Sequence, residues 1–248
     1  MTVTIIIVLL VAAVLVISFI PTFLMIAGNR RYDNGDIDGA FEKFEKAYAT
    51  GRLRPTFVIY YAYLILRHKS PERAYTMLTK LINKKKCDAQ TLLRAKHNIA
   101  LALWRTGRLD EAISLLEKVH TQGPTTITTG ALGALYLERA KRDNDFDSAL
   151  RFALEAYEYN DEDITIADNL GEIYFLLGET EKARALYEAL FALGSPKTPT
   201  PYFNCARTLY AAGDKDGARE MAQTALNMQF TNLTTVEKNE IETFADAL

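Results

Sequence analysis

A small residue returns along this chain at intervals close to 34 residues. The alanines Ala40, Ala74, Ala112, Ala149, Ala183 and Ala218 are separated by 34, 38, 37, 34 and 35 residues. Each follows a turn-like position by about five residues, and these positions are Gly35, Lys69, Gly107, Asn144, Gly178 and Gly213. Such a period predicts helical hairpins that stack side by side, because small side chains let two helices approach closely. The expected fold class is therefore all-α, an α-solenoid of about six hairpins.

Three of the repeating units share a longer pattern. It consists of Asn98, Ala100, Gly107 and Ala112 in the third unit, Asn169, Gly171, Gly178 and Ala183 in the fifth, and Asn204, Ala206, Gly213 and Ala218 in the sixth. This order resembles the tetratricopeptide repeat (TPR) family. The resemblance implies two antiparallel helices per repeat, A and B, and a concave wall built from the A helices. We expect Ala100, Gly171 and Ala206 to face Ala112, Ala183 and Ala218 across each hairpin.

The remaining units depart from the pattern in ways that predict local structure. The second unit has no turn glycine, and Lys69-Ser70-Pro71 is expected to start its second helix. The fourth has about four extra residues before Ala149, which predicts a longer first helix. Residues 234–248 are apolar on one face and predict a C-terminal capping helix, which Thr234 and Glu237 would start as a capping box.

The first 28 residues predict a membrane anchor. The run from Val3 to Ala27 is 25 residues without a charge, and as a helix it would be about 37 Å long. A cleaved signal peptide is the alternative, but residues 1–4 lack the positive side chains that a signal peptide needs. The expected organisation is an anchor over 1–28, a TPR solenoid over 29–233 and a cap over 234–248. Because Gly28 matches a position in helix A of the first repeat, the anchor helix is expected to continue into that repeat.

The distribution of charge gives a direction to this anchor. Arg30 and Arg31 follow it directly, and the positive-inside rule then places the N-terminus outside and the solenoid in the cytoplasm, as a single-pass protein of a bacterial plasma membrane. Residues 29–124 hold 18 Lys and Arg against 10 Asp and Glu, whereas residues 125–248 hold 11 against 21. Arg30, Arg31, Lys84, Lys85 and Lys86 are therefore candidates for contact with anionic lipid. Solvated helix faces are the alternative explanation.

No pattern of catalytic residues is found in the sequence. His68, His97 and His120 are scattered, the two cysteines Cys87 and Cys205 are far apart, and no phosphate-binding loop or zinc-protease motif occurs. We therefore expect no enzyme, no cofactor and no metal ion. Two free thiols are consistent with a reducing compartment, and the near-neutral chain is not expected to bind nucleic acid.

The TPR resemblance implies a partner-binding groove on the concave side. By register, the residues that face it are Tyr63, Arg94, His97, Leu101, Trp104, Arg105, Asp168, Glu172, Phe203, Arg207 and Tyr210. Aromatic and charged side chains of this kind are typical of a binding surface. For some aromatics, Phe175 and Tyr210 above all, packing between neighbouring repeats is an equally good explanation.

The leading hypothesis is a membrane-anchored cytosolic scaffold that binds a protein or peptide in this groove. The alternative is a regulatory or assembly factor for an envelope or membrane-protein pathway that acts through its membrane-facing basic surface. The layout is similar to that of the lipopolysaccharide-assembly regulators, but the four-cysteine knuckle of those proteins is absent. The carboxylate clamp of chaperone-tail receptors is also unmatched, because Ile59, Tyr63, Ile127 and Ala131 occupy its positions. An enzyme on a helical scaffold is the third and least favoured class.

Overall fold

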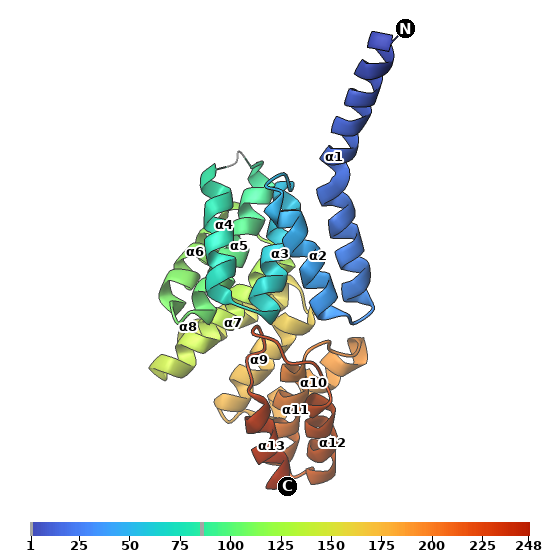
Figure 1. Ribbon diagram of the computed structural model, residues 1–248. Helices are drawn as coiled ribbons and strands as arrows, with labels where there is room; N and C mark the ends of the chain where they lie inside the picture. The colour runs from blue at the N-terminus through green and yellow to red at the C-terminus, as the bar shows by residue number, and fades with distance from the viewer. Residues whose placement is uncertain (1, 85–86) are drawn as a thin grey trace.

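The computed structural model describes the backbone of residues 2–84 and 87–248; the side chains of residues 2–3, 8–9 and 11–16 are outside the description. Over these residues the chain is helical, with antiparallel hairpins stacked into a curved body from which the N-terminal helix projects (Figure 1). The helices are α1 (Thr2–Asp33), α2 (Ile37–Ala49), α3 (Pro55–His68), α4 (Pro71–Lys84), α5 (Ala89–Arg105), α6 (Leu109–Gln122), α7 (Thr126–Asp143), α8 (Asp147–Tyr159), α9 (Ile164–Leu176), α10 (Thr180–Leu193), α11 (Pro199–Ala211), α12 (Lys215–Leu226) and α13 (Lys238–Asp246).

The turn positions and the repeated alanines behave as the period predicts. Gly35, Gly107, Gly178 and Gly213 have φ between 77° and 89°, and Asn144 has φ 53°. This left-handed conformation ends every A helix except α3 and lets the next N–H bond a carbonyl five residues back, as Asp214 does to Leu209 at 2.9 Å. The six alanines on the B helices are at most 1% exposed. The all-α solenoid is confirmed.

The first hairpin is formed by α1 and α2, as predicted from the match at Gly28. A Cβ atom at Gly28 would lie 2.6 Å from Cδ1 of Phe44, so the absence of a side chain makes room for this fully buried ring. Met25 is also fully buried, and the Tyr32 hydroxyl lies 2.8 Å from Nε2 of His68 on α3. α1 therefore runs without a break into the first repeat, and its C-terminal half is part of the core.

The fifth hairpin adds one detail to the expected packing. A Cβ at Gly171 would lie 2.9 Å from Cζ of Tyr187 and 3.1 Å from Cδ2 of Leu186. Gly171 and Gly28 thus have the same role, because each accommodates an aromatic ring placed four residues after the B-helix alanine. Helices A and B therefore do approach each other closely. In these two hairpins the close contact is between a glycine and an aromatic ring.

The predicted membrane span is not supported. Within the described part of the chain, no helix combines the length and the apolarity that crossing a membrane requires. The uncharged run 3–27 lies in α1, but residues 3, 8–9 and 11–16 have side chains outside the description. From Pro21 onward the run also contributes buried residues to the first hairpin, so part of it belongs to the solenoid rather than to an anchor.

Two further expectations are confirmed and one is wrong. α4 begins at Pro71, and α7, with 18 residues, is longer than α5 and α9. The capping box at Thr234 does not form, because α13 begins at Lys238 and Glu237 makes no side-chain cap bond. Instead, the hydroxyl oxygen of Thr234 accepts a hydrogen bond from the N–H of Thr231 at 3.0 Å, which closes a local turn.

Residues 227–237, which we call the strap, connect α12 to α13 by a long route. In Figure 1 the strap leaves the C-terminal hairpin and reaches the end of α3 before it returns to α13. The N–H of Asn232 donates to the carbonyl of Arg67 at 2.9 Å, across 165 residues of chain. The strap therefore connects the C-terminal end of the solenoid to its second repeat.

Candidate peptide-binding surface

The concave side carries an open chamber between α3, α5 and the start of α7. It has a volume of about 630 Å³, and its lining includes Ile59, Tyr60, Tyr63, Leu93, Arg94, His97, Val119 and Ile127. Most of these side chains are apolar or aromatic, and Ile127 is 73% exposed. A volume of this size accommodates one or two apolar side chains of a partner.

The polar groups of the chamber are few. Arg94 is exposed, and no carboxylate pairs with it among the residues that the structure describes. His97 is neutral at physiological pH, because burial lowers its pKa to about 4, and its Nδ1 has no hydrogen-bond partner within the described part of the chain. The chamber thus offers an exposed guanidinium and an unsatisfied imidazole nitrogen in an apolar setting.

A second hollow of about 460 Å³ lies between the concave wall and the strap. Its wall is formed by Tyr63, His97, Leu101, Trp104 and Asp168, and its cover includes Thr231, Leu233 and Thr235. The guanidinium carbon of Arg105 lies 4.9 Å from the centre of the Trp104 ring. The two hollows share Tyr63, His97 and Ile127, so they are consecutive parts of one surface.

Deeper in the C-terminal half, a buried polar network joins α7, α9 and α11. The Glu172 carboxylate accepts from Nζ of Lys141 at 2.8 Å and from Nη2 of Arg207 at 3.0 Å. The side-chain amide of Asn204 donates to Asp168 at 3.0 Å and to Glu172 at 3.1 Å. The Tyr187 hydroxyl donates to Asp168 at 3.1 Å. These contacts link three A helices, although Nε of Arg207 is buried without a hydrogen-bond partner within the described part of the chain.

The two acids of this network have opposite pKa shifts. Burial, together with the nearby Glu172 charge, raises the pKa of Asp168 to about 7. Burial alone would also raise the pKa of Glu172, but the attraction of Lys141 and Arg207 outweighs it and keeps that pKa below its usual range. Glu172 is therefore the charged member of the pair at neutral pH, while Asp168 is only partly ionised.

The structure brings together only part of the predicted groove. Tyr63, Arg94, His97, Leu101, Trp104 and Asp168 line the two concave hollows. Glu172 and Arg207 are engaged in the buried network, and Arg207 also lies 5.0 Å from the ring centre of Phe203. Phe203 is 2% exposed, and Phe244 of α13 contacts both Phe203 and Tyr210 edge to face. The capping helix thus contacts this end of the expected groove, where Phe203 is buried and Tyr210 remains exposed.

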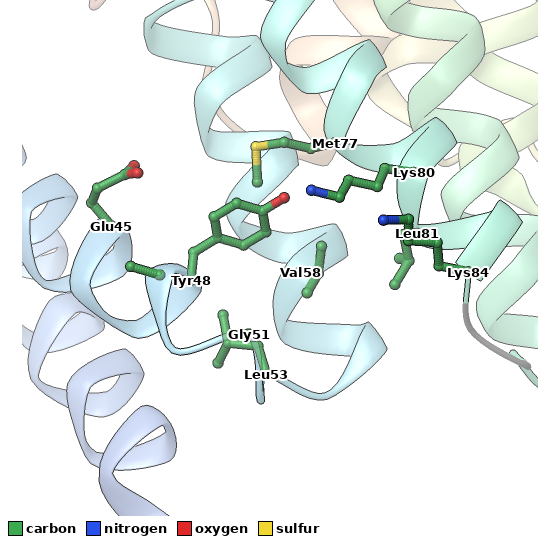
Figure 2. A pocket seen from close by; sticks show the side chains of 10 residues that line it. Glu45, Tyr48, Gly51, Leu53, Val58, Met77, Lys80, Leu81 and Lys84 are labelled. Atoms are coloured by element: carbon green, nitrogen blue, oxygen red, sulfur yellow. The ribbon is translucent and has the colours of Figure 1, made fainter.

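The predicted basic residues do not form one patch. Arg31 pairs with Asp36 at 2.8 Å, at the start of α2, whereas Lys84 lines a hollow of about 470 Å³ with Ala49 and Gly51, beyond the end of α2. The 13 residues of α2 separate these sites by roughly 18 Å. Figure 2 shows Lys80 and Lys84 reaching toward Tyr48 in this hollow. Lys85 and Lys86 lie outside the described residues.

Several surface residues have no counterpart in the sequence-based list. Ile127 and Tyr60 line the open chamber, and Lys197 lies beside the strap. The helical register could have identified Tyr60 and Ile127, since both lie on A helices. The strap residues could not be found in this way, because they come from a connecting segment far away in the chain.

Comparison with known proteins agrees with this architecture. Family models described as tetratricopeptide repeat match residues 92–121 and 163–229. None of the functionally curated proteins matches the sequence. Similar solved structures include pilF of Pseudomonas aeruginosa (16% identity, TM-score 0.59, 92% of this chain and 98% of that one). A tetratricopeptide repeat protein of Parabacteroides merdae is also similar (15% identity, TM-score 0.52, 91% and 97%).

A thermophilic TPR protein from Thermus thermophilus has the same arrangement (18% identity, TM-score 0.56, 82% of this chain and 93% of that one). At these identities the likeness shows the fold alone. The repeat period, the left-handed turns, the stacked hairpins and the two family matches all indicate the same architecture. The chain is an all-α solenoid, and its residues 92–121 and 163–229 match models of the tetratricopeptide repeat.

Proposed function

We propose that this protein is a non-enzymatic scaffold that binds an extended protein segment on its concave side. The open chamber between α3, α5 and α7 is the observation that carries the proposal, because it is apolar, accessible and large enough for a partner's side chain. TPR solenoids generally serve protein interaction, which supports a binding role.

The chemistry of the chamber specifies the kind of segment. Tyr63, Leu93 and Ile127 would contact an apolar side chain, and Arg94 would pair with a carboxylate next to it. Arg67 and Lys197 lie further along the same surface, so the surface favours an acidic partner. The proposed ligand is therefore an extended segment with an apolar anchor flanked by Asp or Glu.

A peptide-display experiment tests this assignment. Random peptides selected on the full chain are expected to be enriched in acidic residues beside an apolar one. Arg94→Glu is expected to weaken a selected peptide by at least about tenfold, or ~1.4 kcal/mol. Arg151→Glu on the exposed surface of α8 makes the same change outside the chamber and is the matched control. Selection of peptides with no acidic preference, or equal loss in both variants, would refute the assignment.

We further propose that the projecting part of α1 attaches the protein to a membrane, with the solenoid in the cytoplasm. The support is the row of exposed apolar side chains Ile5, Ile6, Ile7, Leu10, Ile17, Phe19 and Ile20. Lys80 and Lys84 line the hollow beyond the end of α2, and Arg52 and Arg54 lie between α2 and α3; all four are exposed and could attract anionic lipid. Action through these basic residues is the second candidate function.

Vesicle flotation tests the attachment. The full chain is expected to float with vesicles of neutral and anionic phospholipid, and a variant with Ile6→Asp, Leu10→Asp and Phe19→Asp is expected to remain in the soluble fraction, because three buried carboxylates oppose insertion. Ile127→Asp alters an equally apolar exposed residue of the body and should float like the wild type. Flotation of the triple variant at the wild-type level would disprove attachment through α1.

A further inference from the structure

The strap makes its most specific contacts through one side chain. The amide nitrogen Nδ2 of Asn232 donates to the carbonyls of Leu66 at 3.0 Å and Lys69 at 3.2 Å. The backbone N–H of the same residue donates to the carbonyl of Arg67 at 2.9 Å. A single asparagine from the C-terminal repeats therefore binds three carbonyls at the end of α3.

These carbonyls are available as acceptors because they lie at the C-terminal end of a helix. The last four C=O groups of an α-helix have no partner within it, and α3 ends at His68 without a glycine cap. Lys69, with φ −130°, donates its N–H to Ile65 and leaves the carbonyls of Leu66 and Arg67 for other donors. The end of α3 is thus a recognition site for a residue that offers both a backbone N–H and a side-chain amide.

The next residue gives the contact an apolar component. Leu233 is half-buried and packs against the hydrophobic core of the N-terminal repeats. Further along, the hydroxyls of Thr235 and Thr200 lie 3.0 Å apart, and Val236 is 6% exposed. The strap is uncharged from Asn227 to Val236, and it crosses the concave side over a hollow of about 460 Å³ rather than filling it.

Between Thr231 and Leu233 the strap has the character of a bound peptide, whereas Met228, Phe230 and Val236 on either side of this stretch pack into the C-terminal core. It contains no helix, and its internal order comes from one turn, in which Thr231 and Thr234 exchange hydrogen bonds at 3.0 Å. Its attachment to α3 uses a few hydrogen bonds and one leucine, whereas the hairpins beside it are stabilised by continuous burial. Segments of this kind open at low free-energy cost while the rest of a protein stays folded.

We propose that the strap is an internal ligand, and that the surface from the end of α3 across the concave wall binds extended, uncharged segments with an Asn-Leu pair. A partner segment of this chemistry displaces the strap and takes over the three α3 carbonyls and the leucine site. The inference deepens the proposed use of the concave side and rests on it, since it adds a second subsite with a different specificity. It also makes access to that subsite depend on release of the strap.

A peptide-binding experiment with the full chain tests this proposal. The probe is a labelled synthetic peptide of residues 227–236 with blocked termini, which carries no charge; it is added to the wild type and to the variant Asn232→Ala/Leu233→Ala. The variant, whose own strap is weakened, is expected to bind the peptide at least about tenfold more tightly than the wild type. A peptide with the same two alanine replacements should not bind. Asn227→Ala, an exposed asparagine of the same segment, is the control and should behave like the wild type.

Equal binding by wild type and variant, or no binding by either, would overturn the proposal. If the variant fails to fold, a second measurement on the wild type still tests the proposal. In the wild type, the amides of Asn232 and Leu233 are expected to exchange with deuterium at least about tenfold faster than buried amides of α11. If the strap amides exchange at the same rate as the buried amides of α11, the strap opens only on global unfolding. Because this peptide is uncharged, its binding does not depend on the proposed contact between Arg94 and acidic peptides. The two proposals can therefore be refuted separately.

Discussion

Phe44→Ala is expected to lower the free energy of unfolding by about 3–5 kcal/mol, because it removes a fully buried ring and leaves a cavity beneath Gly28. Phe44 contacts Phe41, Tyr60 and Tyr61 in one aromatic cluster. The cluster joins α1 to α2 and α3, so the loss should be concentrated in the first hairpin. Urea unfolding of the full chain measures the stability, and hydrogen exchange over residues 21–33 measures the release of α1.

Phe23→Ala is the control for this substitution. Phe23 lies on the same helix as Gly28 but is 65% exposed, so its loss should change stability by less than about 0.5 kcal/mol. A Phe44→Ala protein as stable as the Phe23→Ala protein would show that α1 is not held through this ring. Unchanged exchange over residues 21–33 despite lower stability would place the effect in α2 and α3 instead.

Arg207→Leu is expected to destabilise the protein by about 3 kcal/mol, because it removes one of the two cations that hold the buried Glu172 carboxylate. The substitution also removes the guanidinium that lies 5.1 Å from the ring centre of Phe175 and 5.0 Å from that of Phe203. Urea unfolding at pH 7 is measured for the wild type, Arg207→Leu, Glu172→Gln and the double variant. The four free energies of unfolding give the coupling energy between the two positions. We expect a coupling of at least ~1 kcal/mol between the two positions.

The pH dependence distinguishes lost charge from lost packing. In the wild type the pKa of Glu172 is below its usual range, so its ion pairs stabilise the folded state at neutral pH, and this stabilisation is lost as the pH falls through the folded-state pKa. The cost of Arg207→Leu should therefore be smaller at pH 4 than at pH 7. An equal cost at both values, or additive effects in the double variant, would mean that Arg207 acts only by packing.

The hairpins can be predicted from the sequence because their signals are local. Ala112 and Gly107 lie within one hairpin, and a left-handed turn followed by a buried alanine requires no knowledge of distant segments. The continuation of α1 into the first repeat is predictable for the same reason, from Gly28 and Ala40. Helical register also groups Tyr63, His97 and Trp104, and these three residues line one hollow.

The rest of the surface depends on contacts that no local pattern encodes. Phe203 and Tyr210 have the register of groove residues, but Phe244 contacts both from a helix more than thirty positions later, and Phe203 is buried while Tyr210 stays 42% exposed. Thr234 resembles a helix start, yet it closes a turn with Thr231, because the adjacent Asn232 is engaged at α3. The apolar run 3–27 is continuous in sequence, whereas its last residues pack into the first hairpin.

The contact between Asn232 and α3 also changes how this solenoid should fold. In an open stack of repeats each unit depends only on its neighbours, so the array can lose units from one end without consequence at the other. Here the second repeat and the segment after the last one are joined across more than 160 residues. During synthesis the N-terminal hairpins therefore emerge and fold before the segment that completes them exists. In the finished molecule, loss of the C-terminal segment removes hydrogen bonds from the second repeat as well as contacts with its own neighbours.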